Sequence, residues 1–257
     1  MRTPPERRFS PTLRTMMGLL VPVALCAVPR SSHAQRVAVD ARTLKANVFV
    51  YETTLERDNS STRIGTRTVS DSLGTYAGAP AWILAELRTT EGGPVSMDSL
   101  FADTLALRPL HWSSTIGTAR LAAEFRGDTA YGGTSAPIGR RSIVVGMPRG
   151  TIVSAAQLES ELRLLPLQTA WEDSASTLFV TLGSTTVLPT RIAVIGEDRV
   201  QVPAGEFDCW VVSVRAADAT RGLYWVTKQD PIVVRSALDV PSMGGAQLVS
   251  ALSRIGR

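Results

Sequence analysis

The sequence has few of the residues from which metal sites and nucleophilic sites are built. Its 257 residues include two cysteines and two histidines, and one of each, Cys26 and His33, lies in an N-terminal segment that we interpret below as a signal peptide. Zinc sites need several histidine or cysteine ligands, and one remaining cysteine cannot form an internal disulfide. With only His111 and Cys209 left after processing, we expect no metal, no cofactor and no disulfide in the mature chain.

The sequence also lacks the short motifs that mark catalytic and nucleotide-binding loops. It contains no G-x-S-x-G, no G-x-x-x-x-G-K-[ST] and no G-x-G-x-x-G pattern. Ser113, Ser114 and Asp103 lie near His111, but catalytic triads assemble across loops, so proximity in sequence carries little weight. We expect His111 to be an ordinary strand or pocket residue, and we assign no catalytic residue.

Acidic pairs need separate attention because glycosidases use only two carboxylates that face a cleft. The candidate pairs are Glu172 with Asp173, Glu197 with Asp198, and Glu159 with Glu161. Each pair is predicted to lie at a turn or on the surface of a helix, where solvated acids are common. We therefore expect a protein that is not an enzyme.

The N-terminal residues have the order of a secretory signal. A basic stretch precedes an apolar run of 13 residues, from Met16 to Val28, and then the small-residue triplet Ser32-His33-Ala34. The run is too short for a membrane-spanning helix, which needs ~20 residues. We predict that residues 1–34 are a signal peptide, that 35–257 form a single mature domain, and that the protein is exported to the periplasm or cell envelope without a transmembrane span. Lipidation at Cys26 is an alternative that the bulky Leu25 disfavours.

The excess of positive charge belongs to this N-terminal segment. Of the 27 basic and 23 acidic residues, residues 1–34 hold five and one, which leaves 22 of each in the mature chain. A balanced charge gives no basic face for a polyanion. We therefore expect no nucleic-acid partner.

Alternation of apolar and polar residues predicts a mainly β protein. The expected strands are 46–57, 63–70, 81–89, 96 onward, 109–116, 119–126, 141–145, 176–182, 190–196, 207–215, 222–228, 232–238 and 247–254. About a dozen strands are too many for one flat sheet, which would curl or split. The segments 35–45 and 127–137 are predicted to be mobile, the second as a long glycine-rich loop.

One helix is predicted, over residues 154–165. Ser154 and Gln157 fit a capping box, Leu158, Leu162 and Leu165 form one apolar stripe, and a proline follows. A helix with one apolar stripe needs a sheet to pack on. We therefore expect it to lie against the curved sheet.

Four tryptophans in predicted strands are the candidate ligand contacts: Trp82, Trp112, Trp210 and Trp225. They can simply fill the core, or some of them can line a pocket for an apolar ligand in the concave side of the sheet. Alternation places Trp210 on one strand face, and pairing of 207–215 with 222–228 is expected to bring Trp225 to the same face. Cys209, in the same strand, is expected to be a buried thiol of low reactivity.

Several short segments resemble a known group of proteins. They are 76–82 (YAGAPAW), 99–109, 164–167 (LLPL), 202–207 (VPAGEF), 224–226 (YWV) and 233–235 (VVR). Together they resemble exported bacterial domains of unknown function whose fold is similar to that of the lipoprotein localisation factors. The resemblance implies a strongly curved antiparallel sheet, or incomplete β-barrel, with one helix packed in its open side, so that residues 35–257 form one half-barrel-like domain.

Two functions follow as hypotheses. The first is a non-enzymatic cell-envelope protein that binds a lipid or other apolar ligand in the concavity of the bent sheet. The alternative is an envelope interaction or structural protein with a packed, ligand-free core, which contacts an envelope partner through a strand edge or loop. A cavity volume separates them, because ligand sites usually exceed roughly 300 Å³.

Overall fold

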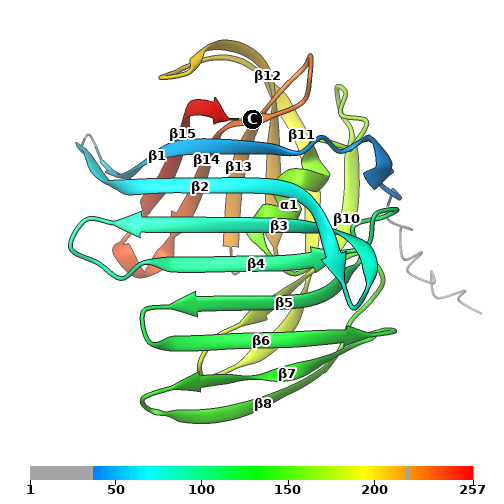
Figure 1. Ribbon diagram of the computed structural model, residues 1–257. Coiled ribbons are helices and arrows are strands. Elements are labelled where there is room, and N and C mark those ends of the chain that lie inside the picture. The colour runs from blue at the N-terminus through cyan, green and yellow to red at the C-terminus, as the bar shows by residue number, and fades with distance from the viewer. Residues whose placement is uncertain (1–36, 59, 218–219, 257) are drawn as a thin grey trace, which may run out of the picture. The chain divides into compact units, whose positions relative to one another are not determined.

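The computed structural model describes residues 37–58, 60–217 and 220–256 (Figure 1). The predicted signal peptide and Cys26 lie outside these residues. Within the described ranges, no helix is long and apolar enough to cross a membrane.

Fifteen strands in the described part of the chain form one sheet. They are β1 (Asn47–Arg57), β2 (Ser60–Tyr76), β3 (Ala79–Thr90), β4 (Ser96–Ala102), β5 (Pro109–Ile116), β6 (Ala119–Arg126), β7 (Thr129–Ala136), β8 (Gly139–Gly146), β9 (Thr151–Ile152), β10 (Glu172–Val180), β11 (Thr185–Val202), β12 (Gly205–Ala216), β13 (Thr220–Thr227), β14 (Val233–Val240) and β15 (Ala246–Gly256). Two short 3₁₀ helices, η1 (Ala41–Thr43) and η2 (Pro241–Met243), complete these elements with α1 (Ala155–Leu162).

The sheet consists of two antiparallel meanders joined at their first and last strands. β1 to β8 follow one another in space, β10 to β15 do the same, and β1 pairs with β15. Among the described residues, the short β9 adds the one parallel pairing, to β10. β8 and β9 are the two edges, so the sheet does not close on itself.

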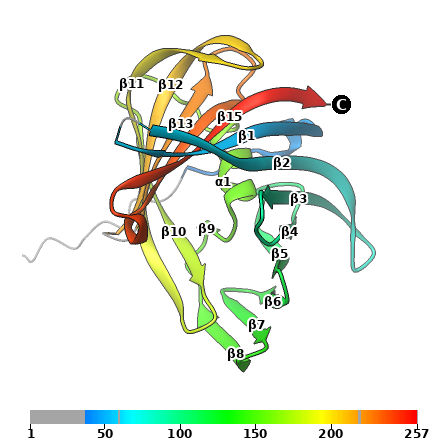
Figure 2. The same ribbon diagram turned by 90° about the vertical axis from the view of Figure 1, so that its left-hand side faces the viewer.

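The sheet bends around α1. In Figure 2, strands of the first meander and strands of the second stand on opposite sides of the helix. Near the gap between the edges, the Arg141 guanidinium of β8 donates a hydrogen bond to the carbonyl oxygen of Gly183, beyond β10. The predicted fold class, a curved and incomplete barrel with one helix in its open side, is confirmed.

Alternation explains how single strands orient. In β6, Leu121 and Ala123 are buried while Arg120 and Ala122 are exposed, so one side of the sheet faces the core and the other faces solvent. β6 and β5 have the predicted bounds. Alternation locates such strands well because each has one dry face and one wet face.

Two segments expected to be mobile contain regular structure in their described residues. Residues 129–136 form β7 between β6 and β8, with the turn before it at Gly127, whose φ is 59°. Gly132 and Gly133 lie inside this strand, where an added side chain would meet the backbone of β6 or β8. The glycines therefore allow close strand approach and do not mark a loop. In the other segment, η1 has a buried Ala41, whose amide donates to the Leu105 carbonyl oxygen at 2.9 Å.

The long hairpin of β11 and β12 bends back over the second meander (Figure 1). The amide of Ala204, at its tip, donates to the Leu252 carbonyl oxygen of β15 at 3.0 Å. Val200 and Val202, near the tip of β11, are buried. The outer face of the second meander is therefore partly covered, while the inner face packs on α1.

Candidate functional site

Helix α1 begins at an N-cap that the sequence predicts. The Ser154 hydroxyl accepts a hydrogen bond from the Gln157 amide at 3.1 Å, and the side-chain oxygen of Gln157 accepts from the Val153 amide at 2.8 Å. Side-chain acceptors of this kind satisfy the amides at the start of a helix. The helix ends at Leu162, with Arg163 as C-cap, three residues earlier than the apolar stripe suggests.

One side of α1 meets β2 and β3 through buried charges. The Arg67 guanidinium contacts Glu86 of β3 and Glu159 of the helix, each at 2.7 Å between nitrogen and oxygen. All three side chains are at most 7% exposed. Arg88 also contacts Glu86. Charges removed from water need partners of this kind.

A second polar group fastens the same side of the helix. The Ser160 hydroxyl donates to Asp71 of β2 at 2.8 Å, and Arg163 forms an ion pair with the same carboxylate. The Arg163 guanidinium also lies over the ring of Phe49, 4.8 Å from its centroid. Two independent ionic contacts thus hold α1 to the first meander.

Burial and ion pairing act in opposite directions on these acids. Burial raises the pKa of Glu159, and Arg67 only partly offsets it. Burial also acts on Glu86, but Arg67 and Arg88 together lower its pKa to about 2. The two carboxylates share one arginine, and the second arginine beside Glu86 accounts for the difference.

The prediction that Glu159 and Glu161 are solvated helix acids is wrong. They are 4% and 2% exposed. The reason is tertiary: α1 lies inside the concavity, so its polar side faces strands and not water. Glu161 accepts a hydrogen bond from Gln157 at 2.9 Å. Burial of two acids on one short helix was not visible in the apolar stripe.

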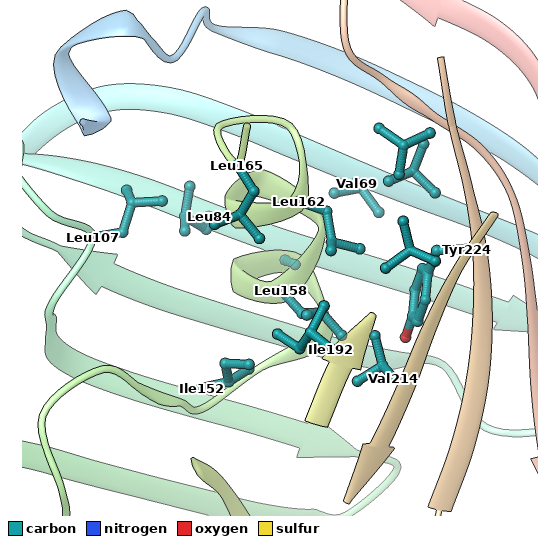
Figure 3. Packing of buried hydrophobic residues seen from close by; sticks show 14 of the residues in the cluster. Val69, Leu84, Leu107, Ile152, Leu158, Leu162, Leu165, Ile192, Val214 and Tyr224 are labelled. Carbon is teal, nitrogen blue, oxygen red and sulfur yellow. The ribbon is translucent and has the colours of Figure 1, made fainter. Parts of the chain in front are cut away.

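The other side of α1 is apolar and packs less tightly. Figure 3 shows Leu158 and Leu162 between the two sheet halves, with Ile192, Val214 and Tyr224 from the second meander. A cavity of about 230 Å³ lies between the helix and this meander. Its lining residues come from β9, α1, β10, β12, β13 and β14: Ile152, Val153, Ser154, Ala155, Leu158, Thr177, Leu178, Phe179, Val214, Ala216, Gly222, Tyr224 and Leu238.

Two small residues of the sheet, Gly222 and Ala216, lie at the wall of the cavity. Gly222 pairs with Val214 on one side and with Leu238 on the other, so its position on the inner face carries no side chain between two apolar ones. Ala216 follows on the same face of β12. Leu238 and Tyr224 lean over Gly222, and an added Cβ would lie 2.8 and 3.0 Å from their atoms. Gly222 therefore makes room for Leu238 and Tyr224, and both of these side chains line the cavity.

Among the described residues that line the cavity, none carries a charge. The Ser154 hydroxyl is used by the N-cap, and the Thr177 hydroxyl bonds to that of Thr190 at 2.7 Å. Apolar walls with few polar groups are typical of small-molecule sites. A cavity of about 150 Å³ with apolar walls can bind benzene, so this one can accept an apolar group of moderate size.

The four tryptophans do not line this cavity. Trp82, Trp112 and Trp225 are buried, and their indole N–H groups donate to the Ala41 carbonyl oxygen at 3.1 Å, to Asp98 at 2.8 Å and to Asp198 at 2.9 Å. Trp210 is half-buried, with the Lys228 ammonium 4.5 Å from its ring centroid. Each buried indole thus has the single partner that a core tryptophan needs.

Trp210 and Trp225 do not share a face, contrary to the prediction. Trp225 pairs with Val211, and Trp210 pairs with Val226, so the two rings lie on opposite faces of the sheet. Tyr224 takes the inner position that was expected of Trp225. The predicted alternation within each strand was correct. The pairing between the two strands is offset by one residue from the expected one, which the sequence does not reveal, so Trp225 lies on the opposite face from Trp210.

The thiol of Cys209 is buried, as predicted. Burial, with Asp198 and Asp208 nearby, raises its pKa to about 11. A thiol with a raised pKa stays protonated and is a poor nucleophile.

His111 lies on the outer face of β5 in an aromatic cluster. Its Nδ1 is 2.8 Å from a Glu124 oxygen, and the Tyr76 hydroxyl donates to the same carboxylate. Tyr76 stacks on His111 with ring centroids 5.9 Å apart. Asp103 instead accepts hydrogen bonds from the amides of its own loop. The residues near His111 in sequence therefore do not form a triad.

An open hollow lies on the outer side of β6 to β8. Arg120 pairs with Ser135, and Ser135 pairs with Arg140, which places two exposed arginines on one face. The hollow has a volume of about 500 Å³ and is floored by small residues such as Gly133. It is wide and shallow, unlike the cavity beside α1. Within the described residues, no group of three or more histidine, cysteine, aspartate or glutamate side chains is placed to hold a metal ion.

Comparisons with solved structures agree with the fold. The chain is similar to a β-barrel-like protein of the DUF1849 domain of unknown function from Brucella abortus, with 12% identity and a TM-score of 0.53 over 85% of this chain and 98% of that one. At this identity the likeness concerns the fold alone.

Two further structures show weaker likeness. An exported protein with a YmcC-like fold from Bacteroides fragilis has 12% identity and a TM-score of 0.29, over 86% of this chain and all of that one. An outer membrane lipoprotein-sorting protein domain from Vibrio parahaemolyticus has 9% identity and a TM-score of 0.24, over 82% and 84%.

The comparison with curated proteins gives no match. The family described as "Protein of unknown function (DUF3108)" matches residues 39–247. That range runs from just before η1 into the first residues of β15. It therefore includes α1 and every strand that lines the cavity. The resemblance to domains of unknown function is confirmed, and the chain belongs to the DUF3108 family.

Proposed function

We propose that this protein is exported to the cell envelope and binds a lipid acyl chain or another apolar ligand in the cavity beside α1. One observation carries the proposal: a space of about 230 Å³ with apolar walls lies inside the concavity and borders α1. The signal-like residues 1–34 support the location. The described residues that line the cavity carry no charge, and the described residues contain no metal-binding cluster. These observations favour binding of a ligand over catalysis in the cavity.

The volume is slightly below the roughly 300 Å³ at which small-molecule sites usually begin. We therefore propose a ligand that inserts one narrow apolar portion between α1 and the second meander. Leu158 on the helix and Leu178 on β10 would contact that portion from two sides. Each buried CH₂ group contributes about 0.8 kcal/mol, so a chain of several methylenes gives useful affinity.

A thermal-stability assay tests this function. Purified exported protein is heated with n-decane, methyl decanoate or a lysophospholipid, and a ligand that binds only the folded state raises the melting temperature. At a concentration 100 times Kd the stabilisation is about 2.7 kcal/mol. Native mass spectrometry of protein from its own envelope fraction then identifies the bound molecule by mass.

A cavity-filling variant tests the location. Ala216→Leu adds apolar volume at the cavity wall, so we expect the ligand-induced rise in melting temperature to disappear. The free protein should become about 0.5 to 2 kcal/mol more stable, because filling a void removes unused space. Ala122→Leu, the same change on the exposed face of β6, is the matched control and should leave binding intact. Binding that survives in Ala216→Leu would contradict the location.

The competing function is an envelope interaction protein with a closed core. Edge strand β8 favours it, because Val144 is 70% exposed and the adjacent turn residue Ile138 is 84% exposed. Exposed edges can pair with a strand from another protein. A protein that responds to none of the three apolar probes, in either wild type or Ala122→Leu, would favour this function over ligand binding.

A further inference from the structure

The hydroxyl of Tyr224 is the polar group of the cavity that the fold does not use. Tyr224 is 5% exposed, and burial raises the pKa of its hydroxyl, so that it remains a protonated donor. Its oxygen lies at the end of the ring nearest Val214, another lining residue (Figure 3). Among the residues that the structure describes, no atom forms a hydrogen bond with it.

Tyr51 shows that a buried tyrosine hydroxyl normally has a hydrogen-bond partner. It is also almost completely buried, and its hydroxyl donates to the Val233 carbonyl oxygen at 2.9 Å. The Tyr224 oxygen differs: it is not one of the fully buried side-chain oxygens without a partner, so it borders the open space of the cavity. Phenylalanine at position 224 would give the cavity the same wall without a hydrogen-bond donor. The retained hydroxyl of Tyr224 therefore points to a partner that enters the cavity from outside the chain.

We propose that the cavity ligand carries a neutral hydrogen-bond acceptor, of the kind an acyl ester carbonyl provides, and that the Tyr224 hydroxyl donates to it. This inference rests on the proposed function. The alkyl portion would lie against Leu158 and Leu178, on either side of the cavity.

The absence of charge in the described cavity lining selects a neutral acceptor. An ionised carboxylate would lose its water in the cavity without meeting a cation. The charged groups that act on Tyr224 belong to the ionic side of α1, and they are Glu159, Arg67, Arg88 and Glu86. They already pair with one another. An ester is therefore favoured over the free fatty acid anion.

The test compares three probes of equal chain length by calorimetric titration of the exported protein: n-decane, methyl decanoate and decanoate at pH 8. We expect methyl decanoate to bind tightest. Tyr224→Phe should weaken the binding of methyl decanoate about tenfold, which is the effect of one net hydrogen bond. The affinity for n-decane should stay within about twofold of the wild-type value. Tyr131→Phe, which removes an exposed hydroxyl from β7, is the matched control and should change neither affinity.

The melting temperature without ligand is the second measurement. Tyr224→Phe should melt at the wild-type temperature or above it, because the hydroxyl that it removes has no hydrogen-bond partner among the described residues. A lower melting temperature would show that the hydroxyl already has a partner in the protein, and it would overturn the inference.

Two other results would also overturn it: equal binding of n-decane and methyl decanoate by the wild type, or equal loss of both in Tyr224→Phe. Either leaves the proposed function standing, because n-decane still binds. If no probe binds the wild type, the proposed function itself fails.

Discussion

The two sides of α1 differ in what holds them. Toward β2 and β3, Glu159 and Ser160 form buried ionic and hydrogen-bonded contacts of fixed geometry. Toward the second meander, Leu158 contacts apolar side chains across a cavity. Directional contacts fix a helix in one position, whereas apolar contacts are non-directional. The helix is therefore fixed to one half of the sheet by directional contacts, and it meets the other half through apolar contacts beside a cavity.

Breaking the ionic contacts of α1 should give the largest loss of stability. Arg67→Met leaves Glu86 and Glu159 buried without their shared cation, and we expect a loss of about 3 to 5 kcal/mol in the free energy of unfolding. Urea unfolding at pH 7 measures it. Arg191→Met, which breaks the exposed pair with Glu172, is the control and should change little.

A further variant separates charge from packing. Replacing the whole group, as Arg67→Met with Glu86→Leu and Glu159→Leu, should recover most of the lost stability, because no buried charge then lacks a partner. If this triple variant is as unstable as Arg67→Met, the contacts matter through their shape and not through their charge.

On the apolar side of α1, the stability lost on truncation should differ between two leucines. Leu162→Ala removes a fully buried side chain and should cost about 2 to 5 kcal/mol. Leu158→Ala should cost less, because Leu158 already borders empty space and makes fewer contacts that can be lost. Chemical denaturation of both variants gives the difference. Equal losses would mean that the cavity is closed in solution.

The smallest effect concerns Asp98 of β4, which is the pairing partner of Glu86. Burial raises the pKa of Asp98 from its ordinary value of 3.8 to about 6, although Trp112 donates to it. A raised acid pKa gives stability that is complete below the unfolded pKa and is lost as the pH rises through about 6. Asp98→Asn should thus be about 1 to 3 kcal/mol more stable than the wild type at pH 7.5.

That advantage should vanish near pH 4, where both proteins carry a neutral side chain. Urea unfolding of wild type and Asp98→Asn at the two pH values isolates this one group, since all other titrations cancel in the difference. A variant that is less stable at pH 7.5 would show that Asp98 is ionised and well paired.

Much of the fold follows from local patterns. Apolar alternation locates strands such as β5 and β6 because each has one dry face, and Ser154 marks the start of α1 because its side chain caps the helix. β7 was missed because Gly132 and Gly133 suggest a loop. Their actual role, close approach to the neighbouring strands, depends on those strands and not on the segment itself.

The candidate site follows from sequence only in part. A ligand in the concavity was expected, but the residues that line the cavity were not, since Val214, Gly222 and Leu238 come together only through the pairing of adjacent strands. A pairing offset of one residue gave Tyr224, and not Trp225, the inner position. Whether the tryptophans contact a ligand stays a prediction. A gap between side chains from five strands and a helix has no signature along the chain.

The pairing of β1 with β15 has a consequence for how the protein reaches this state. Tyr51 and Leu252 are partners although 200 residues separate them, so the seam of the sheet forms only after nearly the whole chain is available. Contacts between distant residues must close a large loop before they stabilise anything, and they slow folding. Until the last strand emerges, the edges of β1 and β14 stay unpaired and open to mispairing with other chains.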